Sequence, residues 1–271
     1  MFDQKMAEKA AENLRSVRKR RPLVHNITNY VVMNYTANAL LACGASPVMA
    51  HAAEEVEEMV SLAGALVLNI GTLSPPWVEA MLKAGKRANA LHIPVILDPV
   101  GAGATRLRTG SARRLIEGIS IQVIRGNASE ILSLAGEESG FGTKGVDSVH
   151  TVDQVAKTAI LLAMELKTTL AISGVVDLIT NGEQICRVMN GHEMMSHVTG
   201  TGCTATVIMA AFLAVYPNPL EAASTGLSYL GLAAEKAATK ASGPGSFQIS
   251  LLDALYEINE EEMRAGAKIR V

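Results

Sequence analysis

This chain of 271 residues has few aromatic residues, only three cysteines and a net charge close to zero. Aromatic side chains make up only 4% of the residues, whereas small residues are abundant, which suits helices packed closely on a sheet. The net charge of −2 excludes an overall electrostatic field that would attract nucleic acid or an acidic membrane surface. The basic run at residues 15–21 is interpreted as a solvated helix end. We therefore predict neither a nucleic-acid partner nor a membrane partner.

The chain has three cysteines, at positions 43, 186 and 203, and no CxxC spacing. This odd number argues against a disulfide framework and predicts a reducing compartment, the cytoplasm. The first residues are typical of an amphipathic helix rather than a signal peptide. The long uncharged stretch at residues 198–220 contains glycines, threonines and prolines, so we interpret it as a buried helix rather than a membrane span.

Short β-branched runs alternate with segments of helical periodicity through the first two thirds of the chain. Strands separated by such helices predict parallel βαβ crossovers, with helices on both faces of one sheet. Asn181-Gly182 then predicts a hairpin between residues 177–180 and 184–188. The fold class expected is α/β, and we treat residues 1–271 as a single domain. The expected strands lie at residues 23–29, 46–49, 65–70, 94–97, 121–125 and 168–173, and the expected helices include residues 30–42 and 247–260. Ligand sites in such sheets lie beyond the carboxyl ends of the strands, which points to ASPVM (45–49), LNIGTL (68–73), LDPVGAGA (97–104) and IRGNASE (124–130).

Three nucleotide- or metal-binding patterns carry little weight here. The sequence HEMMSH (192–197) has HExxxH spacing, which separates the two histidines too far around a helix to share a zinc ion. The GxGxxG match at 140–145 follows a helix rather than a strand, and the GxGxxA match at 200–205 is followed by helices. The chain also lacks a Walker A sequence.

The segment VTGTGC (198–203) is the most informative part of the sequence. Its two glycines allow consecutive backbone N–H groups to converge at the start of a helix, where the helix dipole adds positive potential. Such an anion hole would stabilise a phosphoryl group during transfer. Glycine-rich helix starts also occur as simple caps, so this segment needs partners elsewhere in the chain.

Two acidic residues follow predicted strands and offer oxygen ligands for Mg²⁺, which takes one or two carboxylates. Asp98 ends one strand, and Glu130 belongs to the segment NASE (127–130), which also fits a plain capping box. Arg125 lies beside them as a fixed positive charge for the phosphates of ATP. Together these residues indicate phosphoryl transfer, although each has a structural explanation of its own.

With these residues in place, VTGTGC is similar to the anion-hole motif of the ribokinase-like superfamily, and NASE to its NxxE magnesium motif. Within that superfamily the chain most resembles the hydroxyethylthiazole kinase family. The resemblance implies a ribokinase-like three-layer fold with a mostly parallel sheet. It extends over VHNITNYVVMNYTANALLACGASPVMA (24–50), LVLNIGTL (66–73), PVILDPVGAGAT (94–105), VIRGNASEI (123–131), AISGVVD (171–177) and GPGSFQ (243–248).

The resemblance also implies roles for individual residues. It assigns Met49, Gly200 and Asn29 to the thiazole site, Arg125 and Ser173 to ATP, and Asp98 and Glu130 to Mg²⁺. It gives catalytic roles to Cys203, Gly200 and Gly202, and it implies a homotrimer with active sites between subunits. Cys203 departs from the superfamily, most of which has an aspartate there. We expect the helix start to lower the thiol pKa, which would let Cys203 act as a base.

The function implied is ATP-dependent phosphorylation of 4-methyl-5-(2-hydroxyethyl)thiazole. Two alternatives remain open: a kinase of the same fold for a pyrimidine or pyridoxal, and a thiazole- or thiamine-binding protein without turnover.

Overall fold

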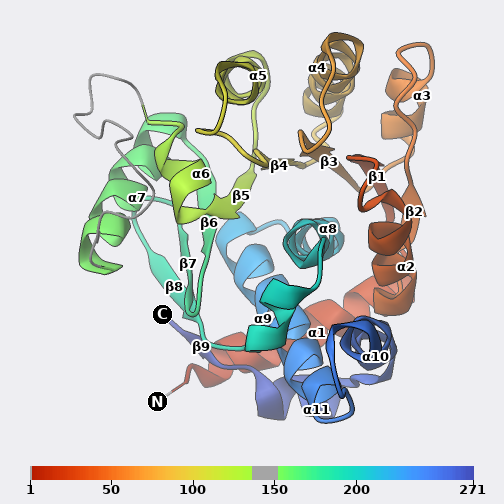
Figure 1. Cartoon of the computed structure of the whole chain (residues 1–271), viewed down its shortest axis with the longest axis vertical. Helices are drawn as coiled ribbons and strands as arrows, with labels where there is room; N and C mark the ends of the chain where they lie inside the picture. The colour runs from red at the N-terminus through yellow and green to blue at the C-terminus, as the bar shows by residue number, and fades with distance from the viewer. Residues whose placement is uncertain (1, 136–151) are drawn as a thin grey trace.

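The computed structural model describes residues 2–135 and 152–271, and the GxGxxG match at 140–145 lies outside them. A nine-stranded sheet runs through the described part of the chain in the order β2-β1-β3-β4-β5-β6-β7-β8-β9. The neighbouring strands from β2 to β6 pair in parallel, and β7, β8 and β9 continue the sheet in antiparallel pairs. Figure 1 shows the sheet between two groups of helices. The predicted α/β architecture is confirmed.

The strands are short, and the central ones, such as β3 and β4, are buried throughout, as expected where a sheet is covered on both faces. Their bounds are β1 Leu23–Ile27, β2 Ser46–Val48, β3 Ala65–Asn69, β4 Val95–Asp98, β5 Val123–Asn127, β6 Thr169–Ser173, β7 Asp177–Thr180, β8 Ile185–Val188 and β9 Ile269–Arg270.

The helices follow the strands as crossover connections and then form a helical C-terminal part. Their bounds are α1 Gln4–Arg20, α2 Met33–Cys43, α3 Val56–Ser61, α4 Pro75–Ala90, α5 Arg106–Gly118, α6 Ala128–Leu132, α7 Val152–Leu166, α8 Thr201–Leu213, α9 Pro219–Ala238, α10 Pro244–Glu257 and α11 Glu260–Gly266. A short 3₁₀ helix, η2 Glu193–His197, precedes α8.

Alternating strand residues divide the core into two layers. Val67, Ile96 and Val123 pack with α1, α2 and α8 to α11 on one face. Leu66, Leu97 and Ile124 pack with α3 to α7 on the other. The scarcity of aromatic residues fits this arrangement, because alanines line much of the contact between α8 and α9.

The sequence located most elements to within a few residues, and the differences have local causes. The helix expected from residue 30 begins at Met33, because the Asn29 side chain accepts the Val31 N–H and the Tyr30 N–H donates to Thr72. The helix expected over residues 247–260 is α10, which ends at Glu257, and Asn259 caps a separate helix, α11, that was not predicted. β9 was not predicted; it pairs with β8 at the edge of the sheet.

The patterns given little weight remain without support in the described residues. Among residues 2–135 and 152–271, no helix combines the length and apolar character that a membrane crossing requires. His192 caps η2, which is too short to present a zinc-binding helix face. The same part of the chain contains no cluster of three or more potential metal-ligating His, Cys, Asp or Glu residues. A Mg²⁺ site of one or two carboxylates does not require such a cluster.

Candidate active site

The candidate site lies where the carboxyl ends of the parallel strands meet the start of α8. In open α/β sheets this edge is where ligands bind. Asn69 ends β3, Asp98 ends β4 and Ser173 ends β6, while Arg125 lies in β5. α8 begins near this edge and packs against β1, β3 and β4 on one face of the sheet (Figure 1). The topology therefore brings together residues that are far apart in the sequence.

The start of α8 depends on its two glycines. Gly200 has a φ of +89°, in the left-handed region, and a β-carbon there would lie 2.8 Å from Val32 Cγ1. A β-carbon on Gly202 would lie 2.7 Å from Nη1 of Arg125, so the guanidinium group lies directly over the first turn of the helix. A helix N-terminus and a guanidinium group are both positive, and their proximity favours an anion at this point.

Arg125 is held by one hydrogen bond, from Nη2 to the Ser173 hydroxyl at 2.8 Å. Its Nε is buried, and residues 2–135 and 152–271 offer it no hydrogen-bond partner. The nearby carboxyl of Asp177 accepts the Gly174 N–H, and burial raises the pKa of Asp177 to about 6 although Arg125 opposes the shift. The two residues assigned to ATP, Arg125 and Ser173, thus lie together with unused donor capacity on Arg125.

Asp98 is fully buried, and its two carboxylate oxygens differ in their partners. Oδ2 accepts hydrogen bonds from Thr206 Oγ1 at 2.7 Å and from Asn69 Nδ2 at 3.0 Å. Oδ1 is buried and has no hydrogen-bond partner among the described residues. Burial raises the pKa of Asp98 to about 6, while the Arg125 charge lowers it. A buried carboxylate oxygen without a hydrogen-bond partner in the described residues fits a Mg²⁺ ion or its water shell.

Glu130 connects the loop after β4 to the start of α6. Its Oε1 accepts the Gly101 N–H at 2.8 Å, and its Oε2 accepts the Asn127 N–H at 2.8 Å. Asn127 accepts the Glu130 N–H in return, so the capping box is confirmed. Each oxygen retains a lone pair for a further ligand. Glu130 therefore has a structural role, and its geometry is also compatible with the predicted Mg²⁺ role.

Cys203 lies against Asn29 and Asn69, and these surroundings do not activate its thiol. Its Sγ accepts hydrogen bonds from Asn69 Nδ2 at 3.2 Å and Asn29 Nδ2 at 3.7 Å. Burial and the neighbouring Asp98 charge raise the pKa of the thiol to about 11. The expectation that the helix start lowers this pKa was wrong, because burial and a nearby carboxylate both disfavour a thiolate. At neutral pH the side chain is a thiol.

Cys203→Ala should therefore slow phosphoryl transfer without abolishing it. A general base contributes about 10²–10⁴-fold, and a neutral thiol should contribute within or below that range. The backbone N–H groups of the α8 start remain in the variant. The measurement is kcat at saturating substrates, with circular dichroism as the folding control. A folded but inactive alanine variant would show that the sulfur is indispensable.

The sequence did not identify Asn69, Thr206 or Arg108 as parts of the site. Asn69 and Thr206 hold Asp98, and Arg108 donates to the carbonyl groups of Ile70, Gly71 and Val100. Arg108 thereby fixes the loops after β3 and β4. The rule that ligands bind at strand ends pointed to the segment containing Asn69, but no residue pattern singled out its side chain. Thr206 and Arg108 lie on helices and gave no signal.

Met49 is the predicted site residue that lies apart from these contacts. It follows β2, the edge strand, and both β1 and β3 lie between β2 and β4 in the sheet. Adjacent strands are about 4.8 Å apart, so Met49 lies roughly 14 Å from the Asp98 strand. Gly200, Asn29 and Cys203 lie on the nearer side, around the start of α8.

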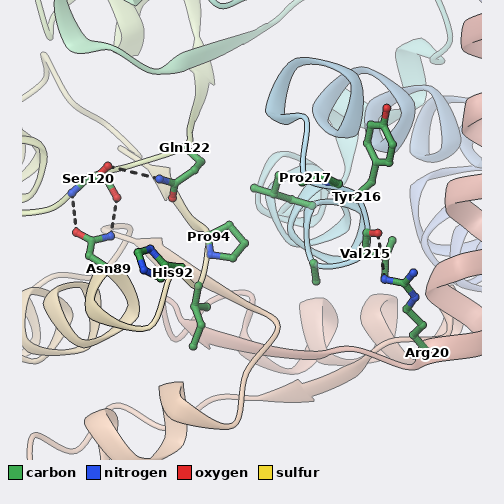
Figure 2. A pocket seen from close by; sticks show the side chains of 12 residues that line it. Arg20, Asn89, His92, Pro94, Ser120, Gln122, Val215, Tyr216 and Pro217 are labelled. Carbon is green, nitrogen blue, oxygen red and sulfur yellow. Dashed lines mark hydrogen bonds between the residues drawn. The ribbon is translucent and has the colours of Figure 1, made fainter.

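A cavity of about 490 Å³ lies at the opposite, amino-terminal edge of the sheet (Figure 2). Its lining includes His92 and Pro94 before β4, Gln122 before β5, and Arg20 and Val215 at helix ends. Several of these polar groups are already paired, since Asn89 and Ser120 bond each other and Arg20 donates to the Val215 carbonyl. The acidic residues and glycines described above do not line it, so we place the chemistry at the carboxyl edge.

Comparison with known proteins agrees with the resemblance seen in the sequence. The profile of the "Hydroxyethylthiazole kinase family" matches residues 14–261. A hydroxyethylthiazole kinase from Desulfotalea psychrophila is 59% identical over 261 residues, covering 96% of this chain and 95% of that protein. The structure of a hydroxyethylthiazole kinase from Pyrococcus horikoshii is 49% identical with a TM-score of 0.89, covering 97% of this chain and 98% of that chain.

The fold extends to more distant proteins. A ribokinase-like superfamily protein from Enterococcus faecalis has a TM-score of 0.64 at 14% identity, and the match covers 96% of both chains. At this identity the likeness concerns the fold alone, and it agrees with the predicted ribokinase-like architecture.

Proposed function

The chain belongs to the hydroxyethylthiazole kinase family, and we propose that it transfers the terminal phosphoryl group of ATP to 4-methyl-5-(2-hydroxyethyl)thiazole. The observation that carries this proposal is the placement of the Arg125 guanidinium over the start of α8, close enough to buried Asp98 for its charge to lower the pKa of that carboxyl. This is an anion site next to an acidic metal site, as phosphoryl transfer requires.

In the proposed reaction, the alcohol oxygen bonds to the γ-phosphorus as the bond to the β-phosphate oxygen breaks, which gives the thiazole phosphate and ADP. The N–H groups of the α8 start and Arg125 stabilise the negative charge on the transferring group. Arg125 is held for this by Ser173. The transition state is loose, so the alcohol loses its proton late, to an oxygen of the transferred phosphate or to solvent, and needs no strong base. A neutral Cys203 is consistent with that requirement.

Mg²⁺, when bound, neutralises charge on the phosphate oxygens. We propose Asp98, through Oδ1, and Glu130 as the residues that hold the ion or its waters. Asp98 is supported by its unpartnered buried oxygen. Glu130 is supported by its position at the neighbouring strand end, where it also fixes the loop that follows Asp98.

We further propose a cytoplasmic homotrimer of single-domain subunits with thiazole sites between them. The position of Met49 directly after the edge strand β2 supports this arrangement, because the edge of one sheet can face a neighbouring copy. The exposed side chains of Tyr30 and Val31, next to Asn29, offer apolar surface near the start of α8. Gly200 and Asn29 would then contact the thiazole from the α8 side.

The substrate assignment is tested by comparing kcat/KM for three alcohols: the thiazole alcohol, pyridoxal and a hydroxymethylpyrimidine. The proposal predicts a clearly higher kcat/KM for the thiazole alcohol. In this proposal the pocket fits that alcohol so that its reacting hydroxyl lies at the start of α8. Equal or higher kcat/KM for pyridoxal or the pyrimidine would assign the chain to the alternative substrates.

Glu130→Gln should lower kcat much more than the affinity for the thiazole alcohol. The carboxylate acts on Mg²⁺ and on the loop after β4, neither of which contacts the alcohol. The matched control is Glu262→Gln, which alters a second capping box of the same kind at the start of α11. Glu262 also pairs with Lys236, so this variant loses an exposed ion pair in addition to the cap. If both variants lose a little thermal stability and keep a normal kcat, Glu130 serves only as a helix cap and has no role toward Mg²⁺.

A further inference from the structure

Asn69 is buried at the end of β3, and its side chain makes four hydrogen bonds. Oδ1 accepts the Gly71 N–H at 2.9 Å and an Asn29 Nδ2–H at 2.9 Å. Nδ2 donates to Asp98 Oδ2 at 3.0 Å and to Cys203 Sγ at 3.2 Å. A backbone N–H can only donate, so the contact with Gly71 fixes which end of the amide carries the oxygen. The amide nitrogen must therefore face Asp98 and Cys203.

The donor from Asn69 determines which oxygen of Asp98 is free. Asn69 and Thr206 both donate to Oδ2, and Oδ1 is left without a protein partner although it is buried. With both donors on one oxygen, the carboxylate is held in one rotation about its terminal bond. Loss of the Asn69 donor would leave Thr206 as the one hydrogen-bond partner described for the carboxylate, which could then turn.

The second N–H of Asn69 donates to Cys203 and so links Asp98 to the anion hole at the start of α8. Cys203 is the third residue of α8, and Gly202 before it contacts Arg125. One amide thus connects the strand-end acid of β4 with the first turn of α8. The connection spans 134 positions in sequence between Asn69 and Cys203.

We propose that Asn69 is a positioning residue for phosphoryl transfer, which sets the Asp98 carboxylate and the first turn of α8 in register with each other. This inference rests on the proposed kinase function. Asn69 itself need not touch ATP or the thiazole. Its effect is on the rate of transfer and not on the binding of either substrate.

Asn69→Asp separates positioning from a purely structural role. Aspartate has the same shape and keeps an oxygen for the Gly71 and Asn29 donors, but it removes the amide donors to Asp98 and Cys203 and places a second buried carboxyl group against Asp98. Two carboxyl groups this close do not both ionise, so the pair shares a proton and the charge on Asp98 changes together with its orientation. The expected result is a fall in kcat of about 10- to 100-fold or more, the range for losing a hydrogen bond to a charged group. The KM values for ATP and the thiazole alcohol should change by less than about threefold.

The matched control is Asn13→Asp, which makes the same substitution at a buried asparagine between α1 and α9. Asn13 Nδ2 donates to Thr225 and does not belong to the site. Its kcat should remain that of the unaltered protein. Circular dichroism and thermal unfolding establish that both variants fold. If Asn69→Asp does not fold, Asn69→Ser, which adds no charge, is judged by the same split between kcat and KM.

The outcomes separate this inference from the proposed function. An unaltered protein without kinase activity would refute the proposed function. An active unaltered protein with normal kcat in folded Asn69→Asp would refute the positioning role. A parallel loss of kcat and rise in both KM values would also refute it, because it would show a general disturbance of the site.

Discussion

Gly202→Val should reduce kcat by about 10²–10³-fold and leave the chain folded. A β-carbon at this position would lie 2.7 Å from Nη1 and 3.1 Å from Nη2 of Arg125. The guanidinium is the flexible end of its side chain, so it moves aside and the helix is preserved. The displaced Arg125 no longer supports the anion hole, and removing a single donor from such a site costs about 10²–10³ in rate. The measurement is kcat at saturating ATP and thiazole alcohol.

Gly110→Val is the control for this substitution. Gly110 lies in α5, and a β-carbon there would meet nothing within 4 Å. Its kcat should be unchanged. Comparison with Cys203→Ala completes the test, because we attribute more of the rate to the backbone and Arg125 than to the thiol. A folded, active Gly202→Val together with an inactive Cys203→Ala would contradict this attribution.

Asp98→Asn should lower kcat by about 10²-fold or more. An amide oxygen can still accept from Asn69 and Thr206, so the new amide nitrogen takes the place of the free Oδ1. That nitrogen cannot bind Mg²⁺ or its waters as a carboxylate oxygen does. The several kcal/mol that a metal contributes to the transition state correspond to this loss in rate.

The same substitution should change the pH dependence of stability in the absence of Mg²⁺. Burial raises the pKa of Asp98 to about 6 from its ordinary value of 3.8, so between these pH values the folded chain binds more protons than the unfolded chain. Stability from this group is complete below pH 3.8 and falls as the pH rises to about 6. The total loss is about 3 kcal/mol.

Asp98→Asn removes this loss. Its free energy of unfolding relative to the unaltered protein should rise by up to about 3 kcal/mol from pH 4 to pH 7. Urea unfolding at several pH values measures the difference, and subtraction removes the contribution of the other carboxylates. If the difference in free energy of unfolding between the two proteins does not change with pH, folding does not raise the pKa of Asp98. A normal kcat would remove Asp98 from the reaction.

Much of the fold and part of the site could be predicted because their signals are local. The hairpin around Asn181-Gly182 and the capping box at Asn127 and Glu130 each depend on a few neighbouring residues, and the structure has both. Asp98 could be located because parallel strands end at one edge of the sheet.

The parts that could not be predicted depend on contacts between distant segments. The Asn69 side chain joins β3, β4, α8 and the segment that follows β1, and nothing in its neighbours along the chain indicates those partners. The pKa of Cys203 was predicted in the wrong direction for the same reason. Sequence shows a helix start, but the burial and the Asp98 charge that dominate the pKa arise only in the folded chain.

The central claim is that this site transfers phosphate and does not only bind the thiazole. The most direct test is ³¹P NMR of the purified protein with ATP, Mg²⁺ and the thiazole alcohol. We expect one thiazole phosphate ester for each ADP formed, and no product when the alcohol is omitted. Binding of the thiazole without any phosphate ester would contradict the account and indicate a binding protein.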